Sequence, residues 1–407
     1  MKKTIAVIGG GAAGFFGAIA AAETYPQARV VLFEKGRNVL SKVRISGGGR
    51  CNVTNAAATV ADLLKGYPRG AKFLKSLFPR FSNQHTIEWF EKRGVKLKTE
   101  ADGRIFPTTD SSETIVRCLQ QQAQQAGVEL QLSTPIRQIR PVATGFELVG
   151  MDETLFTVDR VLVTTGGHPQ LTGYQWLSEL GLSILSPVPS LFTFNIPDSF
   201  TRELPGLSVS DTLVRLAGSK LQQEGPVLLT HWGLSGPAVL KLSAWAAREL
   251  AETNYQFTSL VNWTNEKPEA ARTSLEAFKK LNAGKFVATV APFGIPNRLW
   301  RALLVENEIK DQVRWVDLNG KLFNRLLENL TNGTFQVQGK TTFKEEFVTC
   351  GGIALNQLHP QTLESKVIPG LYFAGEVLDI DGITGGYNFQ AAWTTGWIAG
   401  QSIGQGL

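Results

Sequence analysis

A glycine-rich loop near the start of the chain constrains the fold more than any other feature. Residues 4–8 (TIAVI) form a short apolar run typical of a buried parallel strand, and a G-x-G-x-x-G pattern follows directly. Small residues then continue to Ala22 as a predicted helix, and residues 29–33 (RVVLF) are a second predicted strand. This order predicts an α/β fold with a doubly wound, Rossmann-type parallel sheet.

Each glycine of the loop has a role in binding a dinucleotide. Gly9 permits the tight turn, Gly11 lets the backbone approach a pyrophosphate, and Gly14 allows close packing of helix on strand. The N-terminus of the helix offers N–H groups and the positive end of its dipole to the phosphates. Glu34 lies 20 residues beyond Gly14, at the end of the second strand. A carboxylate there is expected to accept hydrogen bonds from the ribose of an adenosine.

Two further glycine clusters favour FAD over NAD. Residues 46–55 (SGGGRCNVTN) place three glycines beside Arg50, which can neutralise a phosphate, and Lys42 lies shortly upstream. Near the C-terminus, Gly375-Glu376 follows a buried apolar run at 370–374, and Gly385-Gly386 opens an apolar helix. The N-terminus of that helix is expected to stabilise negative charge on a flavin pyrimidine. The alternative for the cluster at 46–55 is a flexible surface loop, and the alternative for the C-terminal cluster is a glycine-rich helix entry with no ligand.

Composition and cysteine usage limit the other possibilities. Of 407 residues, 43% are hydrophobic and 19% charged, which is typical of a soluble globular protein, and the net charge of +6 permits a polyanionic partner. The three cysteines are far apart, so neither a zinc site nor a disulfide framework is indicated and no metal is expected. Five glycines interrupt the uncharged stretch 4–22, which favours a cytoplasmic protein over a signal peptide or a membrane span.

Changes in the residue pattern along the chain predict three domains. Residues 1–189 and 343–407 are expected to form one discontinuous FAD-binding domain. Alternating segments such as 191–196 and 212–216 predict an inserted antiparallel, β-barrel-like domain at 190–263 and 332–342. Residues 264–331 are helical and rich in charge, and are expected to form a helical cap.

Several stretches resemble one family of bacterial flavoproteins, which includes the ribosomal-RNA dihydrouridine synthase and an aminoacetone oxidase. The similar stretches are 42–55 (KVRISGGGRCNVTN), 103–107 (GRIFP), 230–240 (THWGLSGPAVL), 347–353 (FVTCGGI) and 363–400, which ends GITGGYNFQAAWTTGWIAG. The resemblance runs nearly from end to end. It implies FAD, redox chemistry, and inserted β-barrel and helical domains.

The resemblance also implies a set of cofactor contacts. They are Gly9, Gly11, Ala13, Gly14, Glu34, Lys42, Ser46, Gly48, Arg50, Thr165, Gly166, Gly375, Gly386, Tyr387 and Asn388. One departure from the family pattern lies at residues 168–173 (HPQLTG), where the turn after Gly166-Gly167 is shortened. That turn is expected to border the isoalloxazine, so the substrate is less well defined than the cofactor.

Few side chains are candidates for the chemical step. Cys51 is either a reactive thiol or a cysteine packed beside the cofactor. His231 is either a substrate-facing donor or a structural histidine, and His168 follows a strand's carboxyl end, where α/β sheets place ligands. No Ser-His-Asp order is present, which suits an enzyme whose flavin does the chemistry.

Three functions remain open from the sequence. The first is a reductase in which NAD(P)H, bound transiently, gives hydride to flavin N5 for an unsaturated acceptor, and the resemblance suggests uridine in large-subunit ribosomal RNA. The second is an oxidase of a small amine such as aminoacetone, and the third is a non-enzymatic flavin-binding or RNA-binding module. The oligomeric state is not predicted. Cationic candidates for an RNA surface are Lys241, Arg248, Lys267, Arg272, Lys279 and Lys280.

Overall fold

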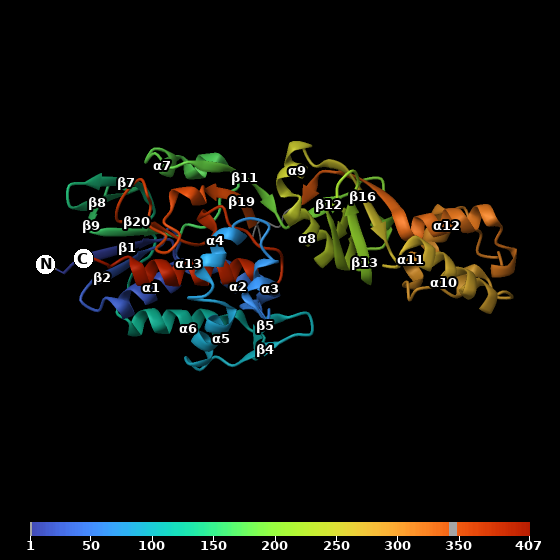
Figure 1. The fold of residues 1–407 in the computed structure, drawn as a ribbon, viewed down its shortest axis with the longest axis horizontal. Helices are drawn as coiled ribbons and strands as arrows, with labels where there is room; N and C mark the ends of the chain where they lie inside the picture. The colour runs from blue at the N-terminus through green and yellow to red at the C-terminus, as the bar shows by residue number, and fades with distance from the viewer. Residues whose placement is uncertain (1, 342–347) are drawn as a thin grey trace. The chain divides into compact units, whose positions relative to one another are not determined.

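The computed structural model describes residues 2–341 and 348–407, and within them the chain forms two compact units (Figure 1). The first unit runs to Ser190 and includes the C-terminal residues, and the second begins at Leu191. Each unit has a hydrophobic core of its own.

The first unit is built on a five-stranded parallel sheet, which confirms the predicted fold class. Its order is β20-β10-β1-β2-β6, and the strands are β20 (Leu371–Phe373), β10 (Arg160–Val163), β1 (Thr4–Ile8), β2 (Arg29–Phe33) and β6 (Glu129–Gln131). The central strand β1 pairs with β10 on one side and β2 on the other, and its apolar run is buried from Ile5 to Ile8. An almost continuous apolar strand is what a sheet covered on both faces requires.

Helices of the first unit pack around this sheet and on one another. α1 (Ala12–Thr24) follows the glycine loop, and α13 (Tyr387–Ser402) contacts it along its length. α6 (Ser112–Gln125) buries Ile115, Leu119 and Ala123 at helical spacing. The shorter helices are α2 (Ser41–Gly49), α3 (Val60–Leu64), α4 (Ala71–Leu77), α5 (Asn83–Glu91) and α7 (Gln175–Ser178).

Three small antiparallel sheets complete the first unit. They are β3 (Thr54–Asn55) with β5 (Arg104–Pro107) and β4 (Leu97–Thr99), then β7 (Ile136–Val142), β8 (Gly145–Gly150) and β9 (Leu155–Val158), and finally β11 (Ile184–Ser190) with β19 (Val348–Ile353). In the last sheet Ser190 is the partner of Val348, so the chain leaves and re-enters the first unit at neighbouring positions.

The second unit combines an antiparallel sheet with five helices. The sheet order is β17-β16-β13-β14-β15-β12-β18, with bounds β17 (Gly333–Gln338), β16 (Gln256–Asn262), β13 (Ser208–Leu216), β14 (Gln222–Thr230), β15 (Gly233–Ser235), β12 (Thr193–Asn195) and β18 (Lys340–Thr341). β17 and β18 end this series, so the described strands form an open sheet and not a closed barrel.

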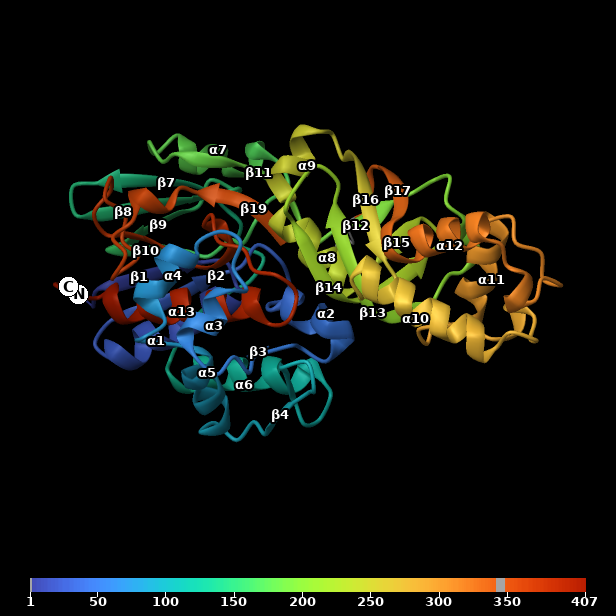
Figure 2. The same ribbon diagram turned by 45° about the vertical axis from the view of Figure 1, so that its right-hand side comes forward.

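The helices of the second unit lie at two ends of its sheet. α8 (Pro237–Trp245) and α9 (Ala247–Glu252) lie at one end, and α10 (Pro268–Leu281), α11 (Asn297–Glu306) and α12 (Gly320–Asn332) lie at the other (Figures 1 and 2). α12 buries Phe323, Leu326 and Leu330 in the core that the sheet also lines. The finer division into a β domain and a helical cap stays a prediction.

Candidate cofactor site

The glycines of the first loop differ in what surrounds them. A Cβ on Gly9 would lie 2.5 Å from Thr164 O, and Gly9 has a φ of +112°, so no other residue fits there. A Cβ on Gly14 would lie 1.9 Å from Gly9 O. Nothing lies within 4 Å of the position that a Cβ on Gly11 would take, in front of α1. The loop is therefore tightly packed behind and open at the helix N-terminus, as a pyrophosphate requires.

Glu34 holds the shape of this loop at the carboxyl end of β2. Its Oε2 accepts a hydrogen bond from Gly10 N (2.8 Å), and its Oε1 accepts one from Gly36 N (2.7 Å). The half-buried carboxylate therefore links the glycine loop to the segment that follows β2. This is the position at which a ribose contact was predicted.

The second glycine cluster forms a left-handed turn that ends α2. Ser46 is extended, and Gly47, Gly48 and Gly49 have φ values of +58°, +67° and +82°. Nothing lies within 4 Å of a Cβ built on Gly48 or Gly49. Three successive residues in this conformation require glycine, and the turn exposes its backbone to open space.

The second and third clusters meet directly. With the Asn52 amide oriented to satisfy both of its groups, its oxygen accepts from Gly386 N at 3.0 Å. The buried Thr54 hydroxyl donates to Gln390 Oε1 (2.6 Å), and a Cβ on Gly386 would lie 2.5 Å from the Thr54 carbonyl. β3 therefore lies against the start of α13, and the two clusters form one surface.

Tyr387 and Asn388 are engaged in holding the loop before α13. The Asn388 amide pairs with the backbone of Gly382, accepting from its N (2.8 Å) and donating to its O (2.9 Å). The Tyr387 ring lies on Gly66, where a Cβ would come within 2.2 Å of the ring, and it meets Tyr67 edge-on. Burial raises the pKa of Tyr387.

An ion pair lies where β10 and β20 end. Lys42 Nζ donates to Glu376 Oε2 (2.7 Å), and Thr349 N donates to Glu376 Oε1 (3.0 Å). Gly166, with a φ of +77°, follows β10 beside this carboxylate, and the exposed Thr165 precedes it. Glu376 was not among the predicted contacts, although its place directly after the last buried strand was a usable signal.

Gly375 and Ala13 tie this region to the first loop. A Cβ on Gly375 would lie 2.7 Å from the Cβ of Ala13 in α1. The backbone N of Gly375 donates to Thr395 Oγ1 in α13 (2.9 Å). Segments from both ends of the sequence therefore meet at the N-terminus of α1.

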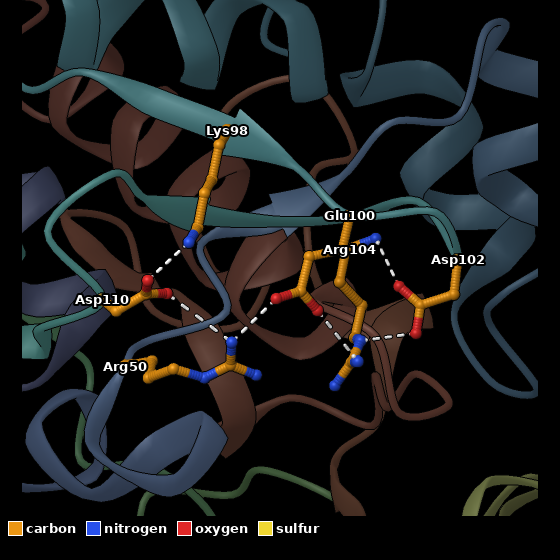
Figure 3. A network of polar contacts seen from close by, with 6 residues as sticks. All are labelled: Arg50, Lys98, Glu100, Asp102, Arg104 and Asp110. Carbon is orange, nitrogen blue, oxygen red and sulfur yellow. Dashed lines mark hydrogen bonds and ion pairs between the residues drawn. The ribbon is translucent and has the colours of Figure 1, made fainter.

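Arg50 lies in a network of charges on the β4–β5 hairpin (Figure 3). Its guanidinium pairs with Glu100 (2.7 Å) and Asp110 (3.6 Å), and it lies 4.1 Å from the centroid of the Phe106 ring. Arg50 was expected to neutralise a phosphate, and that role stays a prediction.

Cys51 is a buried, neutral thiol. It is fully buried, and burial raises the pKa of the Cys51 thiol to about 12 although a hydrogen bond with Ser46 acts in the opposite direction. A thiol that stays protonated at neutral pH is a poor nucleophile. Its catalytic role remains a prediction that this environment does not favour.

The two candidate histidines, His168 and His231, lie in different units. His168 turns back on its own loop, with Nδ1 2.9 Å from Gln170 O, and its backbone N donates to Tyr174 Oη (2.9 Å). His231 is exposed in the second unit, where it lines a pocket of about 510 Å³ with Asp198, Arg202 and Glu203. The described contacts of His168 lie within its own loop and with Tyr174, and those of His231 lie within the second unit.

The residues of the first unit fit FAD. The open space at Gly11, the Glu34 carboxylate, the open glycine turn and the Lys42–Glu376 pair offer groups for phosphates and hydroxyls. Oγ1 of Thr349 is buried beside Glu376 and has no hydrogen-bond partner among the described residues. A donor without a partner is costly unless a ligand satisfies it.

The family is settled by a match over almost the whole chain. Residues 3–402 match the family described as HI0933-like protein Rossmann domain. This chain belongs to that family. It is an FAD-dependent oxidoreductase.

Two characterised relatives match over similar lengths. The ribosomal RNA dihydrouridine synthase of Escherichia coli (strain K12) is 30% identical over 408 residues, which cover 98% of this chain and 97% of the relative. The 3-dehydro-bile acid delta(4,6)-reductase of Clostridium scindens is 27% identical over 414 residues, covering 98% and 99%.

A solved structure supports the fold. The 3-ketosteroid delta1-dehydrogenase of Sterolibacterium denitrificans superposes with a TM-score of 0.52 at 12% identity and covers 99% of each chain. At this identity the likeness concerns the fold alone. Of the helices in the described part of the chain, none is long and apolar enough to cross a membrane.

Proposed function

We propose that this protein is an FAD-dependent reductase of carbon–carbon double bonds, and that its acceptor is a uridine in large-subunit ribosomal RNA. The bound flavin supplies transfer of a hydride from NAD(P)H to the acceptor. The small-amine oxidase becomes the leading alternative if the test below fails.

The observation that carries the reaction type is the chemistry shared by two full-length relatives. One is named for making dihydrouridine and the other for reducing a bile acid, and both names describe addition of hydrogen to a ring double bond. An oxidase of amines would share the cofactor and not this direction of transfer. Reduction is therefore the better supported half of the proposal.

The chain's own residues support the cofactor in this reaction. The N-terminus of α1 would bind the pyrophosphate of the cofactor, and the carboxylate of Glu34 would bind the adenosine ribose. The N-terminus of α13, fixed by Asn52 and Asn388, would stabilise negative charge that develops on reduction. None of these groups needs to exchange a proton.

The RNA half of the proposal is supported by cationic side chains on the second unit. Some of these side chains are engaged in contacts within the unit, and others are exposed. Lys279 Nζ donates to Leu318 O (2.6 Å), and Arg272 donates to Asn324 Oδ1 (3.0 Å), so both have structural contacts. Lys280 and Lys285 are exposed, and Lys285 directly precedes an exposed Phe286 whose ring could stack on a base.

The most direct test measures modified nucleosides. Mass spectrometry of rRNA from a strain lacking this protein should show loss of one dihydrouridine, and expression of the protein should restore it. If every dihydrouridine remains, the rRNA assignment is wrong. Flavin reduction by an amine without NAD(P)H would then support the oxidase.

A binding experiment tests the cationic surface separately. Lys280→Glu with Lys285→Glu should weaken binding of an rRNA fragment and lower its salt dependence by about two counterions, without changing flavin content. The matched control is Lys72→Glu with Lys75→Glu on α4, which makes the same charge change in the first unit. Equal loss in both pairs would mean that only net charge matters.

A further inference from the structure

The residue that leaves the triple-glycine turn is anchored on a hairpin some fifty positions away. Arg50 donates to Glu100 Oε1 (2.7 Å) and lies 3.6 Å from Asp110 Oδ1. Its guanidinium lies over the face of Phe106, at 4.1 Å from the ring centroid. These three contacts fix the position of the Arg50 side chain, which is only one-third exposed.

The carboxylates that hold Arg50 are themselves held. Glu100 Oε2 accepts from Arg104 (3.0 Å), and Arg104 Nε donates to Asp102 Oδ2 (2.7 Å). Lys98 pairs with Asp110. Figure 3 shows these six side chains as one network of three cations and three carboxylates. The charges balance, so the network leaves no surplus positive charge for a phosphate.

The Phe106 ring connects the network to the glycine turn. A Cβ on Gly47 would lie 3.1 Å from Phe106 Cε1, so one part of the ring supports the turn while Arg50 covers its face. Beyond the turn, Val53 N donates to Ile105 O (2.8 Å) and continues the attachment to β5. Without these contacts a run of three glycines would sample many conformations.

We propose that Arg50 is a positioning residue, which fixes the Gly47–Gly49 turn for FAD through Glu100, Asp110 and Phe106, and that its guanidinium does not itself neutralise the phosphates. Pre-organising a glycine turn removes a cost of ordering that ligand binding would otherwise have to meet. The proposal concerns the cofactor and is independent of the acceptor.

Rebinding of FAD to the deflavinated protein tests this directly. The variants are Arg50→Gln, Glu100→Gln and the double variant, and the dissociation constant of FAD is measured for each. Both single variants should weaken FAD about five- to tenfold. The double variant should be no weaker than Arg50→Gln, because the two residues act through one contact.

The control is Asp102→Asn, which removes a carboxylate of the same hairpin that binds Arg104 and not Arg50. It should weaken FAD much less than Glu100→Gln does, because Asp102 reaches Arg50 only indirectly, through Arg104 and Glu100. The melting temperature of each deflavinated variant is measured as well, since positioning predicts a larger effect on FAD affinity than on the stability of the apoprotein. Should Glu100→Gln not fold, Asp110→Asn on the other side of Arg50 replaces it.

Three results would overturn the proposal. If Arg50→Gln weakens FAD while Glu100→Gln leaves it unchanged or tightens it, Arg50 contacts the phosphates directly. If neither variant changes FAD affinity, the turn needs no anchor. If Asp102→Asn weakens FAD as much as Glu100→Gln, the hairpin acts only as general support.

Discussion

At the scale of single residues, the positions of the first glycine motif require glycine for different reasons. Gly14 has no room for a side chain, since a Cβ would lie 1.9 Å from Gly9 O. Gly11 has an ordinary φ of −91° and open space around it, so the protein fold alone does not require glycine there.

This difference separates cofactor binding from folding. Gly11→Val should leave the melting temperature of the apoprotein nearly unchanged and should abolish FAD retention, because the side chain fills the approach to α1. Gly14→Val should instead destabilise the apoprotein itself. Flavin content and thermal unfolding of both variants check this. Normal flavin content in Gly11→Val would move the phosphate site elsewhere.

The Cys51 thiol predicts a specific loss of stability in alkali. Burial raises its pKa to about 12 in the folded protein, from an ordinary value near 9. The contribution of the buried thiol to the free energy of unfolding is fully present below pH 9. It is lost as the pH rises toward 12, because only the thiol of the unfolded chain ionises in this range, and the loss is about 1.4 kcal/mol per pH unit.

Denaturant unfolding between pH 8 and 11 of wild type and Cys51→Ala measures this contribution. The variant should lose less stability as the pH rises. Cys118→Ala is the matched comparison, because the pKa of Cys118 is raised less, to about 11. Identical slopes for wild type and Cys51→Ala would mean that the folded thiol ionises near its ordinary pKa.

At the scale of elements, the α1–α13 contact joins the two ends of the sequence through glycine. A Cβ on Gly396 would lie 2.5 Å from Ala13 O, and one on Gly400 would lie 2.3 Å from Gly17 O. We expect Gly396→Ala to lower the free energy of unfolding by about 1–3 kcal/mol and to weaken FAD, since α1 must shift.

The control for this substitution is Gly320→Ala at the start of α12, where nothing lies within 4 Å of the new Cβ. It should be neutral or slightly stabilising, because alanine reduces the freedom of the unfolded chain. Chemical denaturation of both variants checks the contrast. Equal effects would mean that the glycine contact is not tight in solution.

Elements with a strong local pattern were predictable from the sequence, and pairings between distant segments were not. The strands at residues 4–8 and 29–33 and the start of α13 after Gly386 follow from apolar runs and glycines. The β8–β9 hairpin was missed although its strands are close in sequence, because β9 is mostly exposed and the turn at residues 151–154 has no Asn-Gly or Asp-Gly signal. The Arg50–Glu100 pair was missed because those residues are far apart in sequence and only the β3–β5 register brings them together.

At the scale of the whole molecule, the second unit is an insertion with adjacent ends. β11 ends at Ser190 and pairs with β19, which begins at Val348, in antiparallel register. The change from buried apolar runs to alternating segments near residue 190 predicted an insertion. The sequence could not predict that these two strands would pair. Every predicted FAD contact lies in the first unit, whereas all six cationic residues suggested for RNA lie in the second.

That arrangement predicts the outcome of removing the insertion. Joining Ser190 to Val348 by an Asn-Gly turn would convert β11 and β19 into a two-residue hairpin, for which this turn is suited. The shortened protein should remain yellow and release FAD, not FMN, on denaturation. It should no longer bind an rRNA fragment with steep salt dependence, because the proposed cationic surface is gone. Chromatography of the released flavin and RNA titration at two salt concentrations measure both properties. Loss of flavin from a folded product would mean that the second unit contributes to the cofactor site, and retained RNA binding would place the RNA surface on the first unit.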